Sequence, residues 1–105
     1  MTSTVLPHDE LLGCTVQIPD HVVYRDMVTE TVVLNLQTGR YHGLNPSGGR
    51  ILRALDGSRS SVRKAASVLA AEFGEPGDEV ERDVCAFCAD LAARGLIELR
   101  PDPGS

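Results

Sequence analysis

Residues 32–46 decide the fold, and they run Val32-Val33-Leu34-Asn35-Leu36-Gln37-Thr38-Gly39-Arg40-Tyr41-His42-Gly43-Leu44-Asn45-Pro46. A large apolar residue recurs at every second position from Val32 to Leu36, which is the pattern of a half-buried strand. Thr38-Gly39 predicts a turn before a second strand. Asn45 suits a helix N-cap and Pro46 the first helical position, where proline's missing N–H costs nothing. The stretch therefore predicts a hairpin that passes directly into a helix.

The residues before this stretch add a third strand. Val22 and Tyr24 continue the alternation, so we expect a three-stranded antiparallel meander over about 21–27, 31–37 and 40–44. Pro19 separates an earlier strand piece at Val16 and Ile18, because proline cannot donate to a ladder. In a meander the first and third strands are both edges, and an uncovered edge is a template for another chain.

The second half of the chain changes to a helical period. Three helices are predicted, from Pro46 to about Asp56, from Ser60 or Ser61 to Gly74, and from Asp78 to about Arg94. Gly57 stops the first helix as a left-handed cap, and Asp78 with Glu81 resembles a capping box. The fold class is α+β, winged helix-turn-helix-like, with a three-stranded antiparallel sheet followed by three helices. We expect a flexible arm at 1–13, one domain at 14–99 and a flexible tail at 100–105.

Composition limits the function. The chain has 105 residues with ten basic against fifteen acidic side chains, a net charge of −5 that repels nucleic acid and anionic membranes. It has no Trp, two Phe and two Tyr, so it offers few platforms for stacking bases. Three cysteines and no secretory signal predict a reduced, cytoplasmic protein without structural disulfides. No apolar run is long enough to span a membrane.

The chemistry-bearing residues do not form a catalytic or metal motif. Cys85 and Cys88 form a CxxC in mid-helix, away from a helix N-terminus and without a second ligand pair. The three histidines, His8, His21 and His42, have no Ser or Asp partner at an informative spacing. We therefore expect no enzyme activity, no metal and no cofactor.

The spacing of several short motifs resembles one known family. These motifs are Val33-Leu34-Asn35-Leu36-(x)2-Gly39-(x)-Tyr41-His42-(x)-Leu44-Asn45, then Gly48-(x)2-Ile51-(x)3-Leu55-Asp56-Gly57, then Asp83-Val84-(x)2-Phe87-(x)3-Leu91-(x)2-Arg94-Gly95-Leu96. Together they are similar to the PqqD-like proteins, also called RiPP recognition elements, over residues 20–99. Members of this family bind the leader segment of a ribosomal precursor peptide and deliver it to modifying enzymes.

The resemblance implies a site in which the leader adds as a strand to the third strand, in a groove facing the third helix. Carried onto this chain, the peptide-binding residues are Arg40, Tyr41, His42, Gly43, Leu44, Asp83, Val84, Phe87, Cys88 and Leu91. Cys88 departs from the family, which typically has Leu there. A stand-alone chain of this size is most similar to the leader-binding protein of lasso-peptide biosynthesis. That likeness implies a leader peptidase of the cysteine-protease type and a lactam-forming cyclase as partners.

Two other functions are alternatives. The first is a PqqD-type peptide chaperone for a radical SAM enzyme, which shares the same motifs. The second is a winged-helix DNA-binding regulator, which needs Lys or Arg against phosphates. The predicted third helix opposes that function, because it carries many more acids than its two basic residues, Arg82 and Arg94.

Overall fold

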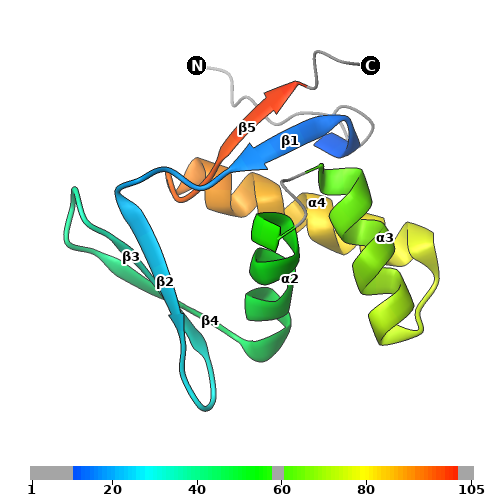
Figure 1. Ribbon diagram of the computed structural model, residues 1–105, viewed down its shortest axis with the longest axis horizontal. Coiled ribbons are helices and arrows are strands. Elements are labelled where there is room, and N and C mark those ends of the chain that lie inside the picture. The colour runs from blue at the N-terminus through cyan, green and yellow to red at the C-terminus, as the bar shows by residue number, and fades with distance from the viewer. Residues whose placement is uncertain (1–10, 58–60, 102–105) are drawn as a thin grey trace.

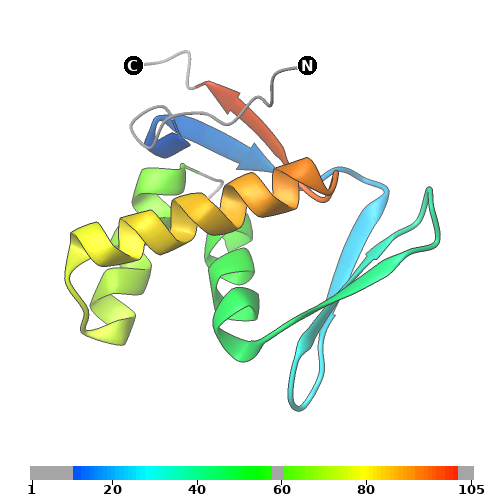
Figure 2. The ribbon, with the colours of Figure 1, turned by 180° about the vertical axis from the view of Figure 1, so that it is seen from behind.

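The computed structural model describes residues 11–57 and 61–101. Strands β2 (Val22–Asp26), β3 (Thr31–Asn35) and β4 (Tyr41–Leu44) form an antiparallel sheet in the order β2-β3-β4. Helices α2 (Pro46–Gly57), α3 (Val62–Phe73) and α4 (Gly77–Ala93) follow, and α4 crosses both other helices (Figures 1 and 2). The predicted α+β class and the three-stranded meander are confirmed.

The turn between β3 and β4 includes the predicted Thr38-Gly39 but starts earlier than expected, because β3 ends at Asn35. The Asn35 side chain accepts hydrogen bonds from the amides of Gln37 and Thr38, at 2.9 and 3.3 Å. Gly39 has a φ of 76°, a conformation that glycine adopts without steric cost. These bonds explain why a polar side chain, Asn35, lies buried at the end of a strand.

One face of the sheet packs against α2. Val22, Val33 and Leu44 are buried on that face, and Tyr24 donates a hydrogen bond to the α2 residue Asp56 at 2.7 Å. On the opposite face, register places Val23, Leu34 and Tyr41 side by side, and Tyr41 is 73% exposed. The sheet therefore has one face in the core and one face toward solvent.

Most helix ends follow the capping signals. Asn45 caps α2 by accepting from the Gly48 amide at 2.7 Å, and Ser61 caps α3 by accepting from the Lys64 amide at 3.2 Å. Gly74 and Gly95 end α3 and α4 with φ values of 66° and 74°.

One departure lies at the start of α4, where the capping box predicted at Asp78 and Glu81 is wrong. The helix starts earlier, after Pro76, and no side chain caps it. The expected left-handed cap at Gly57 also differs, because α2 runs through that residue.

A second sheet was not predicted. Strands β1 (Cys14–Gln17) and β5 (Glu98–Pro101) pair antiparallel, from Cys14 opposite Pro101 to Gln17 opposite Glu98. This pairing joins the two ends of the described chain above the helices (Figure 1).

The described structure reaches past the predicted domain boundaries of 14 and 99. Leu11 and Leu12 are buried, and Arg100 and Pro101 belong to β5. The rest of the predicted arm and tail, 1–10 and 102–105, lies outside the described residues.

The core sits between the helices and both sheets. Its largest fully buried side chains are Val33, Leu55, Val62, Leu69, Val80, Val84, Cys88, Leu91 and Leu96. None of the helices in the described part of the chain has the length and apolar character that crossing a membrane requires.

Candidate peptide-binding groove

The backbone of β4 leaves hydrogen-bonding groups at the edge of the sheet. Within the described part of the chain β4 pairs with β3 alone, and the Asn35 amide donates to the Arg40 carbonyl at 2.9 Å. Antiparallel partners alternate between hydrogen-bonded and non-hydrogen-bonded pairs, so His42 and Leu44 also turn their backbone groups toward β3. The N–H and C=O groups of Tyr41 and Gly43 consequently point outward, where an added strand would meet them.

A groove runs beside this edge. It has a volume of about 400 Å³ and is lined by Gly43, Leu44, Asn45, Ser47, Gly48, Ile51, Asp83, Phe87, Asp90 and Arg94. β4 supplies one wall, the first turns of α2 supply the floor, and α4 supplies the other wall. Gly48 allows α2 to lie close to α4, since a Cβ there would be 3.2 Å from the Phe87 ring.

Three residues of α4 and its C-cap residue Arg94 form the helix wall. Asp83, Phe87, Asp90 and Arg94 follow one another at spacings of four, three and four, which places them on one stripe of the helix. Phe87 is only partly buried, so its ring offers an apolar surface to an incoming side chain.

The rim of the groove is largely acidic. Asp90 pairs with Arg94 at 3.3 Å, and Arg94 also lies 3.5 Å from Nδ1 of His42 on β4. On the strand side, the Glu30 carboxylate lies close to Gly43, because a Cβ there would be 2.6 Å from Oε1. These contacts place Arg94 between the helix wall and the strand wall at one end.

The groove includes part of the site predicted from the sequence. Gly43, Leu44, Asp83 and Phe87 line it together. Arg40, Tyr41 and His42 are not among its lining residues, although His42 contacts the lining residue Arg94 and the Tyr41 side chain is exposed at the edge. Val84, Cys88 and Leu91 are 0% exposed, because they form the adjacent core stripe of α4. They support the wall and do not present side chains to the groove.

Sequence reasoning missed six lining residues, which are Asn45, Ser47, Gly48, Ile51, Asp90 and Arg94. The signal for the two on α4 was present, because Asp90 and Arg94 continue the helical spacing that starts at Asp83 and Phe87. Those on α2 have no such signal, since their place depends on how α2 meets α4.

The buried thiols are held in their protonated form. Burial raises the pKa of Cys88 to about 12, and burial also raises the pKa of Cys85, with a further contribution from Glu81. A thiolate is the form that attacks electrophiles or binds metal, so neither thiol is activated at neutral pH. Within residues 11–57 and 61–101, no group of three or more His, Cys, Asp or Glu residues is arranged to hold a metal.

Comparison with known proteins identifies the family. Residues 30–97 match the family described as Coenzyme PQQ synthesis protein D (PqqD). The chain belongs to the PqqD family. The resemblance to PqqD-like proteins is thereby confirmed over β3, β4 and the three helices.

Two solved structures of similar fold are leader-peptide complexes. One, TbiB1 in complex with the TbiA(beta) leader peptide, is 35% identical, with a TM-score of 0.72 over 82% of this chain and 99% of that chain. The other, a lasso peptide synthetase B1 complexed with the leader peptide, is 24% identical, with a TM-score of 0.68 over 79% of this chain and 96% of that chain, and shows the fold alone. No curated protein matches this PqqD-family chain.

Proposed function

We propose that this PqqD-family chain is a leader-peptide-binding RiPP recognition element of lasso-peptide biosynthesis. The observation that carries the proposal is its likeness, at 35% identity, to a protein solved with a leader peptide bound. The open edge of β4 beside the groove supports the same function, because it offers an unused pair of backbone donors and acceptors to an extended peptide.

The proposed binding mode is strand addition. The leader pairs with the outward groups of Tyr41 and Gly43, and main-chain bonds of this kind give affinity that tolerates different sequences. Selection comes from side chains that enter the groove and meet Leu44, Ile51 and Phe87. Arg40 and His42 flank this pairing, and a role for their side chains in binding stays a prediction.

The chain acts as an adaptor and not as a catalyst in this proposal. It works in the cytoplasm with a leader peptidase of the cysteine-protease type and with a lactam-forming cyclase. Binding the leader and the peptidase together raises their effective concentration to about the millimolar range without any chemistry in the adaptor. Accordingly, the purified chain leaves a precursor intact, and adding it to the peptidase speeds leader cleavage.

A titration with a fluorescently labelled leader peptide from the neighbouring precursor gene tests the proposal. We expect saturable binding in the micromolar range or tighter, about −8 kcal/mol. Gly43→Pro removes an outward N–H that the β3–β4 ladder does not use, so this variant should fold and lose binding. Gly43→Ala is the matched control: it keeps the N–H and displaces only the flexible end of Glu30. Wild-type protein that fails to bind, or a folded Gly43→Pro that binds normally, would overturn the proposed function.

A further inference from the structure

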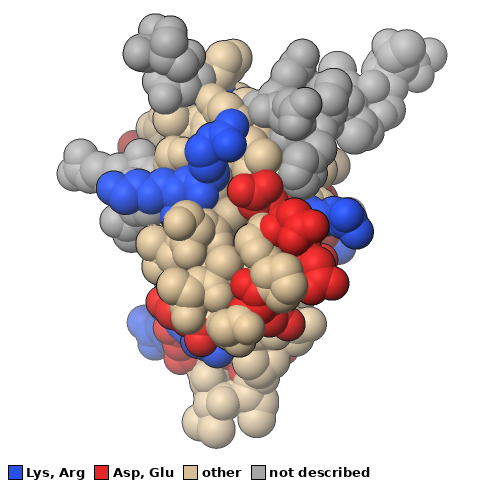
Figure 3. Space-filling view, turned by 90° about the vertical axis from the view of Figure 1, so that its right-hand side faces the viewer, with Lys and Arg blue, Asp and Glu red and all other residues tan. Residues whose placement is uncertain are grey.

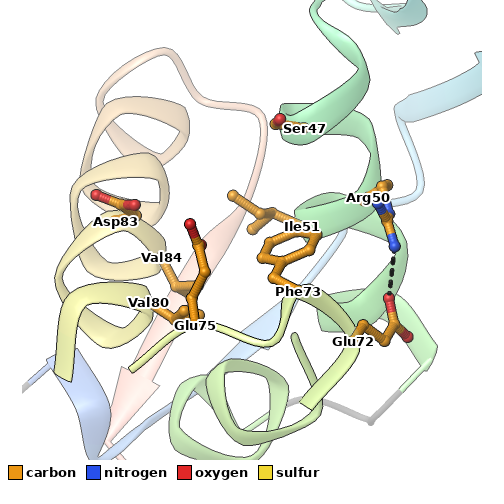
Figure 4. A pocket seen from close by; sticks show the side chains of 9 residues that line it. All are labelled: Ser47, Arg50, Ile51, Glu72, Phe73, Glu75, Val80, Asp83 and Val84. Atoms are coloured by element: carbon orange, nitrogen blue, oxygen red, sulfur yellow. Dashed lines mark hydrogen bonds and ion pairs between the residues drawn. The ribbon is translucent and has the colours of Figure 1, made fainter. Parts of the chain in front are cut away.

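A second hollow adjoins the groove on the side away from the sheet. It lies between α2, α3 and α4, has a volume of about 580 Å³, and has an apolar floor made by Ile51, Phe73, Val80 and Val84 (Figure 4). Ser47, Ile51 and Asp83 line both the groove and the hollow. The two spaces therefore adjoin at the first turns of α2, close enough for one extended peptide to contact both.

Carboxylates surround the apolar floor. The Arg50 guanidinium pairs with Glu72 at 3.2 Å and lies 4.7 Å above the centre of the Phe73 ring. Glu72 therefore already has a cationic partner. Glu75 and Asp83 have no ion-pair partner among the described residues. In Figure 4 the Glu75 side chain stands between α4 and the Phe73 ring. The hollow thus combines apolar contact area with two carboxylates that lack a cation.

Acidic side chains outnumber basic ones around the hollow, where Arg50 lies among Glu72, Glu75 and Asp83. Between residues 65 and 81 the chain has no Lys or Arg, and its five acids are Glu72, Glu75, Asp78, Glu79 and Glu81. Figure 3, which faces the α3–α4 side of the molecule, shows acidic side chains gathered there. Such a region attracts a cation and disfavours an acidic side chain of a peptide.

We propose that this hollow binds a lysine or arginine of the leader peptide, and the proposal rests on the proposed function. Long basic side chains fit its composition, because their aliphatic stems pack on apolar surface while their charged ends reach carboxylates. The stem would lie on Ile51 and Phe73, and the charged end would meet Glu75 and Asp83. A purely apolar anchor would use the floor and leave the two carboxylates without a partner.

The direction of β4 indicates which part of the leader enters. β4 runs from Tyr41 to Leu44, and the hollow lies beyond Leu44, past Ser47 of α2. The sheet is antiparallel throughout, and an antiparallel added strand continues that pairing. Such a strand runs opposite to β4, so the residues that pass over Ser47 are those N-terminal to the paired segment. The basic residue of the leader is therefore in this N-terminal flank.

The test uses the same labelled leader peptide and a second version in which each Lys and Arg of the N-terminal flank is changed to Gln. Glu75→Gln is the informative protein variant, because Glu75 lines the hollow and not the groove. Glu79→Gln is the matched control, since it removes one acidic charge from the same region without lining the hollow. We expect Glu75→Gln to weaken parent-peptide binding by about two- to fivefold at low salt, and less at high salt.

The peptide in which the flanking Lys and Arg are changed to Gln should bind wild type and Glu75→Gln equally, because it lacks the cation that Glu75 would meet. Equal binding of the parent peptide by wild type and Glu75→Gln, with Gly43→Pro still inactive, would overturn this proposal and leave the proposed function standing. The proposal would also be overturned if Glu79→Gln lost as much affinity for the parent peptide as Glu75→Gln. The same holds if affinity depended on basic residues in the C-terminal flank of the leader. Failure of wild type to bind the parent peptide would overturn both.

Discussion

Gly49 sets how closely α2 packs on the sheet. A Cβ at this position would overlap the hydroxyl of Thr31, which is buried and donates a hydrogen bond to Asp26 at 2.7 Å. We predict that Gly49→Ala lowers the free energy of unfolding by about 1–3 kcal/mol, the usual cost of overpacking. Gly77→Ala is the control, because a Cβ there meets nothing within 4 Å and alanine favours helix. Urea unfolding measures both; a Gly49→Ala variant as stable as wild type would contradict the close contact.

The buried thiol of Cys88 should make the folded chain less stable at alkaline pH. Burial raises its pKa to about 12 in the folded chain, against an ordinary value of 9.0. Above pH 9 the unfolded chain loses this proton first, so stability is complete below that pH and falls as the pH rises toward 12. Tyr24 acts in the same direction, because burial and the Asp56 hydrogen bond raise its pKa to about 12.

The check is a set of urea midpoints measured from pH 8 to 11 under reducing conditions. Cys88→Ala should be less stable at every pH, since it leaves a cavity, but its stability should fall less steeply with pH. An unchanged slope would show that the Cys88 thiol does not contribute to the alkaline loss.

At the scale of single elements, α4 carries two neighbouring stripes with different tasks. Leu91 belongs to the core stripe and is 0% exposed, whereas Phe87 belongs to the groove stripe and is partly buried. We predict that Leu91→Ala lowers the free energy of unfolding by about 2–5 kcal/mol. Phe87→Ala should cost less stability and weaken leader binding at least as much as any other single change on this stripe. Paired unfolding and binding titrations separate the two effects; a Phe87→Ala variant with normal affinity would contradict the groove wall.

The two stripes also explain what the sequence predicted well and what it did not. Local signals placed the meander and some of the helix ends, because the Thr38-Gly39 turn, the Asn45 and Ser61 caps and the Gly74 stop act within a few residues. Periodicity did not separate the groove stripe of α4 from its core stripe, since Asp83, Asp90 and Arg94 are equally typical of a solvated helix face.

At the scale of the whole molecule, the features that escaped prediction are those made by distant segments. β1 and β5 have four residues each and pair across almost the full length of the chain, so neither has a local partner to reveal it. The groove floor likewise depends on where α2 meets α4. The family resemblance predicted the strand edge at which a peptide would bind, and the structure shows which residues line the groove beside that edge.

Hydrogen exchange measured by NMR, with and without the leader peptide, tests the central claim most directly. Strand addition to β4 predicts that the amides of Tyr41 and Gly43 exchange more slowly in the complex, because each gains a backbone partner. At the opposite edge of the sheet, the register of β2 turns the amides of Tyr24 and Asp26 outward, and these should keep their rates. Unchanged exchange at Tyr41 and Gly43, or new protection at Tyr24 and Asp26, would contradict the account.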